Sequence, residues 1–545
     1  MSAADGTLWV AFNGEIYNYR ELRTQLEQLG HAFRTHSDTE VILEAYLQWG
    51  TGAFARLDGM FALALWDTRS STLTLARDRT GKKPLYVYQD SEKVVFGSEI
   101  KAILAHPGID TRANPEAVPQ FLSHGYVPTP ATFYARIRKL PPACFETLTA
   151  ASREPNQTEY WDFPLGPERV IRTADQLAEA EATVRELFTA AVKRRLIADV
   201  PLGAFLSGGI DSTLVVAVMS QLASKPVKTF SIGFEGAPDF DETKYARIVA
   251  ERYRTEHTEF KVKPESFGLI DSLAWHYDEP FADASAIPTY LVSKLTREAG
   301  CTVALTGDGG DEVFAGYSRF IAATQAEHVP KPIRSLTRRL LEPVPKLGQR
   351  TAMLERSRRF ALNASRELPE RLRGWISIFS VSEVRALLSE HESRYATTAL
   401  IGETYEKHFR RAREAGADTL NQVLYANAKT YLLDDLNVKV DRASMAVGLE
   451  SRSPFLDTAL MSYAFTLPGH VKIKGRETKW LLKRAMRDLL PDEVVNRPKM
   501  GFGVPISRWV ELNPERVGTH LAQLRNQPDA TDLQKWALLQ LARLG

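Results

Sequence analysis

The segment Leu206–Ser212, with the sequence LSGGIDS, constrains the fold more than any other part of this chain. It lies between a predicted buried strand and a predicted helix, and the free backbone N–H groups at a helix start attract anions. Its two adjacent glycines let the backbone approach an anion closely, because neither residue carries a Cβ. The hydroxyls of Ser207 and Ser212 can donate to phosphate oxygens, and Asp211 is placed to hold a Mg²⁺ ion that bridges phosphates.

A tight strand-to-helix turn capped by a serine would explain a Gly-Gly pair by itself. The complete Ser-Gly-Gly-x-Asp-Ser string in this setting favours phosphate binding instead. The segment is not a Walker loop, because it lacks the Gly-Lys-Ser/Thr ending that such a loop requires. The sequence therefore predicts a phosphate-binding loop of another kind.

The elements around this loop alternate between helix and strand. The hydrophobic pattern predicts a helix over 174–196, a strand over 200–206, a helix over 212–222 and strands over 227–234 and 302–306. A strand, turn, helix and strand in this order are typical of a parallel sheet. From about residue 320 the chain is predicted to be mostly helical.

The first 150 residues have a different pattern, in which short strands dominate. Alternating apolar residues predict strands over 7–12, 60–66, 71–76 and 93–96, and amphipathic spacing predicts helices over 19–29 and 39–49. The first strand is expected to end at Asn13-Gly14, since this dipeptide is typical of hairpin turns. We therefore expect an α+β unit rich in antiparallel pairing, followed by a polar connection over 152–168 that marks a boundary.

Composition excludes several classes of protein. The chain has 545 residues and a net charge of +2, which gives no support for a nucleic-acid-binding or membrane-surface protein. The basic stretch 334–339 (RSLTRR) is expected to be a solvated helix face. The two cysteines, Cys144 and Cys301, are too few for a disulfide framework or a four-ligand zinc site. No apolar run is long enough to span a bilayer and no signal peptide is recognised, so a cytoplasmic location is expected.

Further motifs lie outside the loop. They are 13–18 (NGEIYN), 76–78 (ARD), 81–86 (GKKPLY), 305–317 (LTGDGGDEVFAGY), 448–457 (GLESRSPFLD) and 497–503 (RPKMGFG). With these motifs, nearly the whole chain resembles the glutamine-dependent asparagine synthetases, which belong to the ATP pyrophosphatases. The resemblance implies an α/β fold: a parallel-sheet ATP-pyrophosphatase domain with a helical C-terminal part, preceded by an α+β N-terminal-nucleophile glutaminase sandwich.

In this family, aspartate attacks the α-phosphate of ATP to give β-aspartyl-AMP and pyrophosphate, and ammonia then displaces AMP to give asparagine. The resemblance implies that Asp211 and Asp311 hold Mg²⁺, which neutralises charge on the leaving pyrophosphate. It places Lys479 and Lys499 near the phosphates and the adenylate, and it adds Glu312 as a catalytic candidate. The ATP-binding candidates are Leu206, Ser207, Gly208, Gly209, Asp211, Ser212, Ile232, Thr306 and Gly307.

The acidic residues after the strand at 302–306 are also relevant to which acid the protein adenylates. A solvated acidic loop is the alternative explanation, but the interleaved glycines after a buried strand favour a site. The family often has Glu at the position of Asp308. The assignment of aspartate as the acceptor acid is therefore less specific. The segments 278–280 (DEP) and 283–285 (DAS) are expected to line the acceptor pocket, and Arg452 lies in a family motif without an assigned role.

The first half resembles the family's glutaminase domain, in which an N-terminal cysteine attacks the side-chain amide of glutamine. Asn13 and Gly14 match the oxyanion-hole positions, and Glu15 and Asp38 match residues that hold the α-amino group of glutamine. No cysteine occurs in the first 143 residues, and the family's Arg-containing segment before the Asn-Gly-Glu motif is absent.

We therefore expect a truncated type 2 glutamine amidotransferase domain over 1–155 and an asparagine synthetase domain over 165–545. The preferred explanation is a start at an internal methionine or a fragment, and the alternative is a truncated protein that uses free ammonia. In either case this polypeptide is not expected to hydrolyse glutamine. The missing strands would also leave sheet edges uncovered.

Other functions compete with this one. A related amidotransferase or β-lactam-forming ligase could adenylate a different acid, for example in cell-surface glycan biosynthesis. A tRNA-thiolating enzyme would need paired cysteines, and a non-catalytic scaffold would not need the intact loop. The expected cofactors are ATP and Mg²⁺, and the expected partners are aspartate, ammonia or glutamine, and a second copy of the chain, but no nucleic acid and no membrane.

Overall fold

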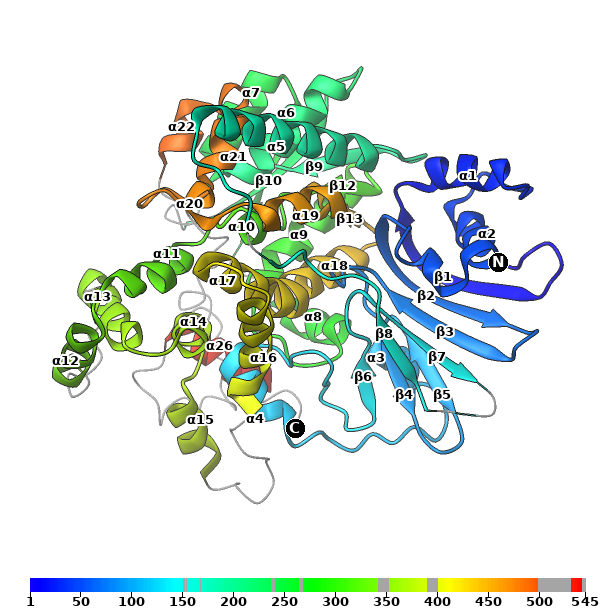
Figure 1. Cartoon of the computed structure of the whole chain (residues 1–545), viewed down its shortest axis with the longest axis horizontal. Helices are drawn as coiled ribbons and strands as arrows, with labels where there is room; N and C mark the ends of the chain where they lie inside the picture. Colours follow the sequence, from blue (N-terminus) through cyan, green and yellow to red (C-terminus); the bar gives the residue numbers. More distant parts are fainter. Residues whose placement is uncertain are drawn as a thin grey trace.

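The computed structural model describes residues 1–149, 152, 154–166, 168–236, 241–263, 268–341, 352–389, 400–497 and 531–541. The antiparallel sheets of the N-terminal part lie on one side of the molecule, and a parallel sheet with many helices forms the other side (Figure 1). The chain is therefore an α/β protein preceded by an α+β unit, as the sequence predicted.

The strands are β1 (Leu8–Ile16), β2 (Gly59–Asp67), β3 (Thr72–Arg77), β4 (Tyr86–Gln89), β5 (Val94–Gly97), β6 (Ile137–Lys139), β7 (Cys144–Thr149), β8 (Asn156–Glu159), β9 (Leu202–Phe205), β10 (Lys228–Phe234), β11 (Glu256–Val262), β12 (Val303–Leu305) and β13 (Glu450–Arg452).

The α-helices up to residue 341 are α1 (Tyr19–Gln28), α2 (Asp38–Trp49), α3 (Ile100–Leu104), α4 (Ala117–His124), α5 (Ala174–Arg195), α6 (Ile210–Leu222), α7 (Thr243–Tyr253), α8 (Ile270–Tyr277), α9 (Ala286–Glu298), α10 (Gly310–Val313), α11 (Ser318–Gln325) and α12 (Lys331–Leu341). They are followed by α13 (Ala352–Ala364), α14 (Leu368–Ile376), α15 (Val381–Leu388), α16 (Leu400–Glu414), α17 (Thr419–Asn427), the π-helix η7 (Ala428–Leu436), α18 (Asn437–Met445), α19 (Thr458–Thr466), α20 (Gly469–Lys472), α21 (Trp480–Ala485), α22 (Asp492–Asn496) and α26 (Asp532–Leu541).

The N-terminal unit is layered, and the alternation of side chains along β2 explains why. Phe61, Leu63 and Leu65 point to one face of the sheet β1-β2-β3-β7-β8, where they pack against α1 and α2. Ala62 and Ala64 point to the other face and pack against the second sheet, β5-β4-β6. Because successive side chains in a strand point to opposite faces, one strand serves two cores, and the small alanines let the sheets approach closely.

The expected end of the first strand at Asn13-Gly14 is wrong. Strand β1 continues through both residues to Ile16 and pairs with β2 along its whole length, Gly14 lying opposite Phe61. Gly14 does not form a turn but lets β1 approach β2 closely, because a Cβ at this position would lie 2.0 Å from the Met60 carbonyl oxygen. A dipeptide typical of turns therefore lies inside a strand here.

The C-terminal sheet is parallel throughout, with the order β11-β10-β9-β12-β13. Helices α5, α6 and α7 cover one face and α8 and α9 cover the other, so β10 and the middle of β9 are buried, whereas the edge strand β11 stays largely half-exposed. Within the sheet, β10 lies on one side of β9 and β12 lies on the other side. The loops after β9 and β12 therefore separate at the carboxyl edge of the sheet, where open α/β sheets bind ligands.

No helix of the described residues is long and apolar enough to cross a membrane.

We expect Gly14→Ala to destabilise the folded protein by about 1–3 kcal/mol, because its Cβ would overlap the backbone of β2. The thermal unfolding midpoint measured by differential scanning fluorimetry should fall by several degrees. Gly52→Ala is the matched control, since a Cβ at Gly52 meets no atom within 4 Å. Equal midpoints for Gly14→Ala and the parent would contradict the close approach.

Candidate functional site

The phosphate loop joins the end of β9 to the start of α6. The Leu206 N–H donates to the Phe230 carbonyl at 2.8 Å, which fixes the loop to β10, and the hydroxyls of Ser207 and Ser212 lie 3.0 Å apart. Gly208 has a φ of +69°, and a Cβ there would lie 2.6 Å from α7 at Tyr245. No side chain caps the start of α6. The loop therefore presents the helix start, with two hydroxyls beside it, as an anion site.

A buried lysine joins the two predicted metal ligands. The Lys479 ammonium contacts the Asp211 Oδ2 atom and lies 2.5 Å from the Asp311 Oδ1 atom, and the residue is only 5% exposed. Burial opposes the charged form of Lys479, but the charges of Asp211 and Asp311 outweigh it and raise the pKa of the ammonium. Lys479 also has a φ of +54°, a left-handed conformation that non-glycine residues seldom adopt and that clusters at functional sites.

Glycines leave room for these carboxylates. A Cβ at Gly310 would lie 2.5 Å from the Asp211 carboxyl group, and one at Gly316 would lie 1.8 Å from the Asp311 Oδ1 atom. The residues fit Mg²⁺, since a pair of carboxylates that meet at one point beside a phosphate site is the usual protein contribution to its coordination. No group of three or more His, Cys, Asp or Glu side chains suited to a metal occurs in the described chain. Phosphate oxygens would have to complete the shell.

The loop after β12 supplies the other predicted nucleotide contacts. The buried Thr306 donates through its hydroxyl to the Asp308 Oδ2 atom at 2.7 Å, and its N–H donates to the Arg452 carbonyl. A Cβ at Gly307 would lie 2.9 Å from the Asp211 Cβ atom. Ile232 is buried on β10, next to β9. The predicted residues from β9, β10 and β12 thus gather at one edge of the sheet.

Glu312 belongs to a chain of polar contacts that leads away from this cluster. It is buried and accepts a hydrogen bond from the Tyr317 hydroxyl at 2.5 Å. The Arg319 guanidinium carbon lies 3.9 Å from the centre of the Tyr317 ring and 4.5 Å from that of Tyr431 on η7. The Arg319 guanidinium also donates a hydrogen bond to the Asn427 side-chain oxygen at 3.4 Å. A cation stacked between aromatic rings in this way suits a carboxylate of a ligand.

Lys499, a predicted catalytic residue, lies outside the described residues. Arg497 is described, and the sequence did not predict its place at the phosphate loop. Its guanidinium lies over the Tyr245 ring, 4.6 Å from the ring centre, and pairs with Glu242 at 2.8 Å. A Cβ at Gly209 would lie 3.6 Å from the same guanidinium, so Arg497 reaches the phosphate loop. Its place at the head of the RPKMGFG motif was the only signal in the sequence.

The four predicted glutamine-binding residues lie on β1 and at the start of α2. Asp38 accepts a hydrogen bond from the Ile16 N–H at 3.0 Å, and the Asn13 amide donates to the Ser98 hydroxyl at 3.1 Å. Gly14 lies between Asn13 and Glu15 on β1. The structure therefore places the Asp38 carboxylate beside the end of β1, while the Asn13 side chain contacts Ser98.

Glu15 reaches across to the other unit. Its Oε2 atom lies 2.8 Å from the Arg452 guanidinium on β13, whose other contacts are Glu450 and the carbonyls of Arg195 and Ile197. Burial raises the pKa of Glu15 to about 7, even though Arg452 opposes the shift. Arg452, left without a role by the sequence, thus links the two units.

Comparison with known proteins identifies the family. The asparagine synthase family model matches residues 183–544 and the glutamine amidotransferase domain model matches residues 1–161. The chain belongs to the asparagine synthase family. It is 33% identical over 526 residues to "Asparagine synthetase [glutamine-hydrolyzing] 1" of Bacillus subtilis, covering 94% of this chain and 78% of that protein.

Other relatives are named as asparagine synthetases or as amidases. A "Putative asparagine synthetase [glutamine-hydrolyzing]" of Mycobacterium tuberculosis is 34% identical, covering 92% of this chain and 75% of that protein. "Amidase chry2" of Gibberella zeae is 26% identical, covering 92% and 78%. Among solved structures, the glutamine phosphoribosylpyrophosphate amidotransferase of B. subtilis matches with a TM-score of 0.22 and 11% identity, covering 56% of this chain and 63% of that one.

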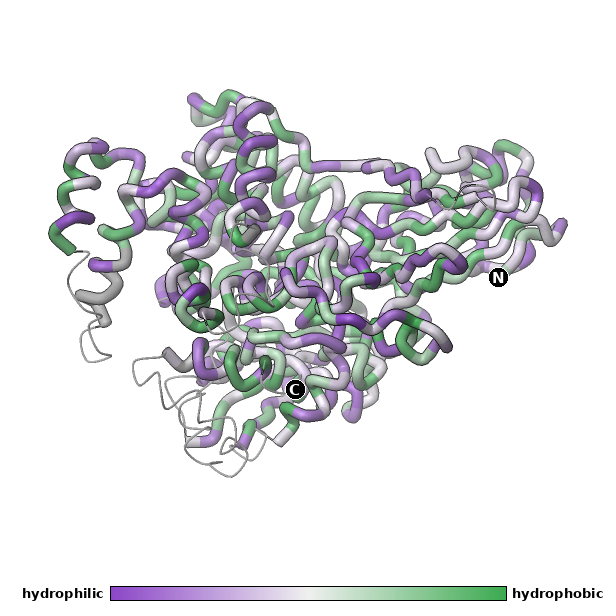
Figure 2. The backbone as a smooth tube through the Cα atoms, turned by 90° about the horizontal axis from the view of Figure 1, so that it is seen from below, coloured by the Kyte–Doolittle hydropathy of each residue, from purple (hydrophilic) through white to green (hydrophobic). Residues whose placement is uncertain are grey.

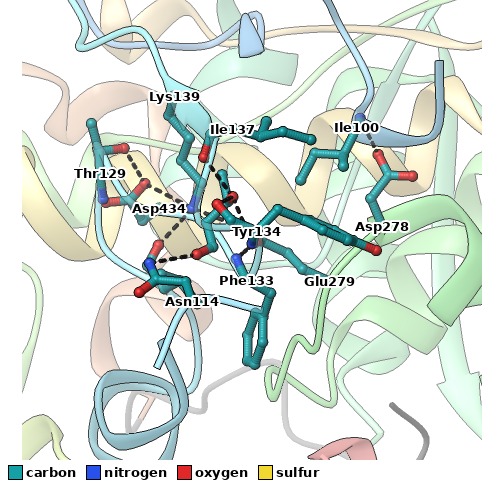
Figure 3. A network of polar contacts seen from close by, with 12 residues as sticks. Ile100, Asn114, Thr129, Phe133, Tyr134, Ile137, Lys139, Asp278, Glu279 and Asp434 are labelled. Carbon is teal, nitrogen blue, oxygen red and sulfur yellow. Dashed lines mark hydrogen bonds and ion pairs between the residues drawn. The ribbon is translucent and has the colours of Figure 1, made fainter. Parts of the chain in front are cut away.

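A segment that the sequence analysis overlooked holds the two units of this family member together. It is 432–445 (LLDDLNVKVDRASM), at the end of η7 and along α18. Asp434 accepts hydrogen bonds from the Thr129 N–H and hydroxyl at 2.9 and 2.6 Å, and Lys83 pairs with Asp441 at 2.9 Å. Figure 3 shows the Asp434 end, where Lys139 also reaches Glu279 at 3.1 Å. Regularly spaced charges in an apolar helical stretch were the signal.

The same segment extends to the predicted acceptor-pocket residues. Lys439 pairs with Asp283 at 2.7 Å, and Ser285 donates to Asp283 as well. Burial alone would raise the pKa of Asp283, but Lys439 and Ser285 outweigh it and lower it to about 2. Burial and the nearby Asp283 charge raise the pKa of Asp435. Asp283, Asp435 and Lys439 all lie close enough to Tyr431 to shift its pKa.

Both cysteines are buried. Burial raises the pKa of the Cys144 thiol to about 11 and shifts that of Cys301 in the same direction. Because the thiolate is the nucleophile, neither residue is suited to attack an amide at neutral pH.

The raised pKa of Glu15 predicts a pH-dependent stability. The folded state binds this proton more tightly than the unfolded state, so stability is lost as the pH rises from about 4.5 through 7. Between pH 5 and 8, the thermal midpoint of the parent should fall relative to that of Glu15→Gln. Glu21→Gln, an exposed change on α1, is the control and should follow the parent. Parallel curves for the parent and Glu15→Gln would contradict the assignment.

Proposed function

We propose that this chain uses ATP to adenylate aspartate and then transfers ammonia to the β-aspartyl-AMP, giving asparagine, AMP and pyrophosphate. The observation that carries the proposal is the buried Lys479, held by Asp211 and Asp311 at the start of α6. A candidate anion site at the start of α6, the Lys479 cation and two potential metal ligands thus lie next to one another. Membership of the asparagine synthase family supports the ligase chemistry.

In the first step, some residues bind the phosphates and others stabilise the charge that develops on them. The start of α6, the hydroxyls of Ser207 and Ser212, and Arg497 hold the β- and γ-phosphates. The acceptor carboxylate attacks the α-phosphorus, the bond to the β-phosphate oxygen breaks, and pyrophosphate leaves. Lys479 stabilises the negative charge that develops on the phosphates. A Mg²⁺ ion on Asp211 and Asp311 would add further neutralisation of the leaving group when bound.

The second step needs a nucleophile and a place for its proton. Ammonia attacks the carbonyl carbon of the adenylate, AMP leaves from that carbon, and the nitrogen loses one proton. We assign Glu312 as the candidate acceptor of this proton, because it is a buried carboxylate next to Asp311 in sequence and is held by the Tyr317 hydroxyl. Lys499 is retained as a candidate from the family motif.

The acceptor pocket that we infer extends from Glu312 to η7. Arg319, stacked between Tyr317 and Tyr431, would receive a second carboxylate of the acceptor. The Asp283 carboxylate would receive an amino group beside Lys439. Aspartate carries both groups. A larger acid with the same two groups, as in cell-surface glycan or β-lactam chemistry, is the second candidate. Two relatives that match more than nine-tenths of this chain are named amidases and not asparagine synthetases.

The decisive measurement is pyrophosphate release from ATP and Mg²⁺ with a panel of amino acids and other carboxylic acids. We expect aspartate to trigger release, and Asp211→Asn to reduce it by at least about 100-fold because a charge that faces the leaving group is lost. Asp175→Asn, an exposed change on α5, is the control. Unchanged release in Asp211→Asn would remove the metal-site assignment, and release with another acid alone would favour the second candidate.

The nitrogen source provides a separate prediction. Since both thiols are buried and protonated, we expect ammonium salts to support amide formation and glutamine to fail as a donor for this polypeptide. The amide product is measured by mass spectrometry with ¹⁵N-labelled ammonium or ¹⁵N-amide-labelled glutamine. Label transfer from glutamine at a rate comparable to that from ammonium would contradict the prediction.

A further inference from the structure

Helix α12 has its apolar side on the outside of the molecule. Ile333, Leu336 and Leu340 are 55%, 60% and 66% exposed, although large apolar side chains of a surface helix normally face the core. Their spacing of three and four residues places them on one face of the helix. Three neighbouring apolar side chains that point to solvent therefore form a continuous stripe, which we call the α12 stripe.

The opposite side of α12 explains this orientation. Arg334 is buried and donates through its guanidinium to the Ala364 carbonyl at the end of α13, at 3.0 Å. A buried guanidinium with a backbone acceptor is costly to expose or to leave unpaired. The arginine thus fixes the rotation of α12, and the stripe is held outward by the fold. For Arg334, the expected solvated basic face is wrong.

Helix α12 itself is basic. It carries four Lys or Arg and no acidic residue, whereas the whole chain has a net charge of only +2. Arg334 is buried, Lys331 and Arg339 are exposed, and Lys331 lies 3.9 Å from the exposed Glu367 just before α14. The near-neutral total thus hides a local basic helix.

The position of the helix leaves the stripe accessible. In Figure 1, α12 and α13 project at the end of the molecule opposite to the antiparallel sheets. Figure 2, seen from below, shows the same projection at the same end. The two views agree that these helices stand away from the main body.

We propose that α12 is an interfacial helix that binds the surface of a membrane rich in anionic lipids. The α12 stripe would enter the boundary between headgroups and acyl chains, while Lys331 and Arg339 contact lipid phosphates. A large apolar stripe beside basic residues fits this ligand better than a nucleic acid, which needs the charge but not the apolar side chains. The inference goes beyond the proposed ligase reaction and does not depend on it.

The test is co-sedimentation of the full chain with vesicles of phosphatidylcholine alone or with about 30 mol% phosphatidylglycerol. We expect binding to the anionic vesicles, weakened at high salt, and a decrease of at least 10-fold in the partition coefficient for the double variant Leu336→Glu/Leu340→Glu. Lys331→Glu/Arg339→Glu should weaken binding to anionic vesicles in particular. Val170→Glu, a change at an exposed apolar residue outside the helix, is the control and should bind like the parent.

Pyrophosphate release and the thermal midpoint serve as checks that the variants are folded. No binding of the folded parent to anionic vesicles, or equal binding of the parent and the Leu336→Glu/Leu340→Glu variant, would overturn the proposal. Binding of a mixed-sequence RNA by the parent without vesicle binding would assign the basic region to nucleic acid instead. A change of molecular mass of the same double variant in light scattering, without vesicle binding, would assign the stripe to contact between two copies.

Discussion

The ion cluster of Lys479 with Asp211 and Asp311 is the interaction on which the arrangement of the C-terminal unit depends. It joins three segments far apart in sequence: the start of α6, the loop after β12 and the segment before α21. Two carboxylates that close together would repel each other without a cation between them, and a buried lysine would lose its charge without them. The close packing of Gly310 and Gly316 against the carboxylates leaves the cluster little freedom to relax.

A second set of buried charges joins the N-terminal and C-terminal units. Asp434 and Asp441 of the 432–445 segment hold Thr129 and Lys83, and Arg452 of β13 holds Glu15. Each pair places an N-terminal group against the same elements, η7, α18 and β13, that border the candidate acceptor pocket. Removing one partner of such a pair would leave a buried charge without compensation, so the units are held in one relative position. Glu15 and Arg452 thereby connect the predicted glutamine-binding residues to Thr306, a predicted nucleotide-binding residue.

Local patterns predicted much of this fold. The strands at 60–66 and 227–234 and the helices at 19–29, 39–49 and 212–222 occur within a few residues of their expected ends, because the hydrophobic period is a local property. The prediction failed at Asn13-Gly14, where contact with Met60, nearly fifty residues away, outweighs the local preference for a turn. It also failed at Arg334, whose burial depends on the end of α13. Lys499 was named from its motif and lies outside the described residues.

The two classes of sheet and the strand–turn–helix setting of the predicted phosphate loop at Leu206–Ser212 could be predicted from the amino-acid sequence, since they follow from side-chain periodicity and from short motifs. Four further features come from tertiary packing: Lys479 stands between the two aspartates, Arg497 reaches the loop, Arg452 pairs with Glu15, and the α12 stripe faces outward. Each of these depends on atoms brought together from distant parts of the chain. The rotation of α12 and the burial of Lys479 are set by packing and charge compensation, which no local pattern encodes.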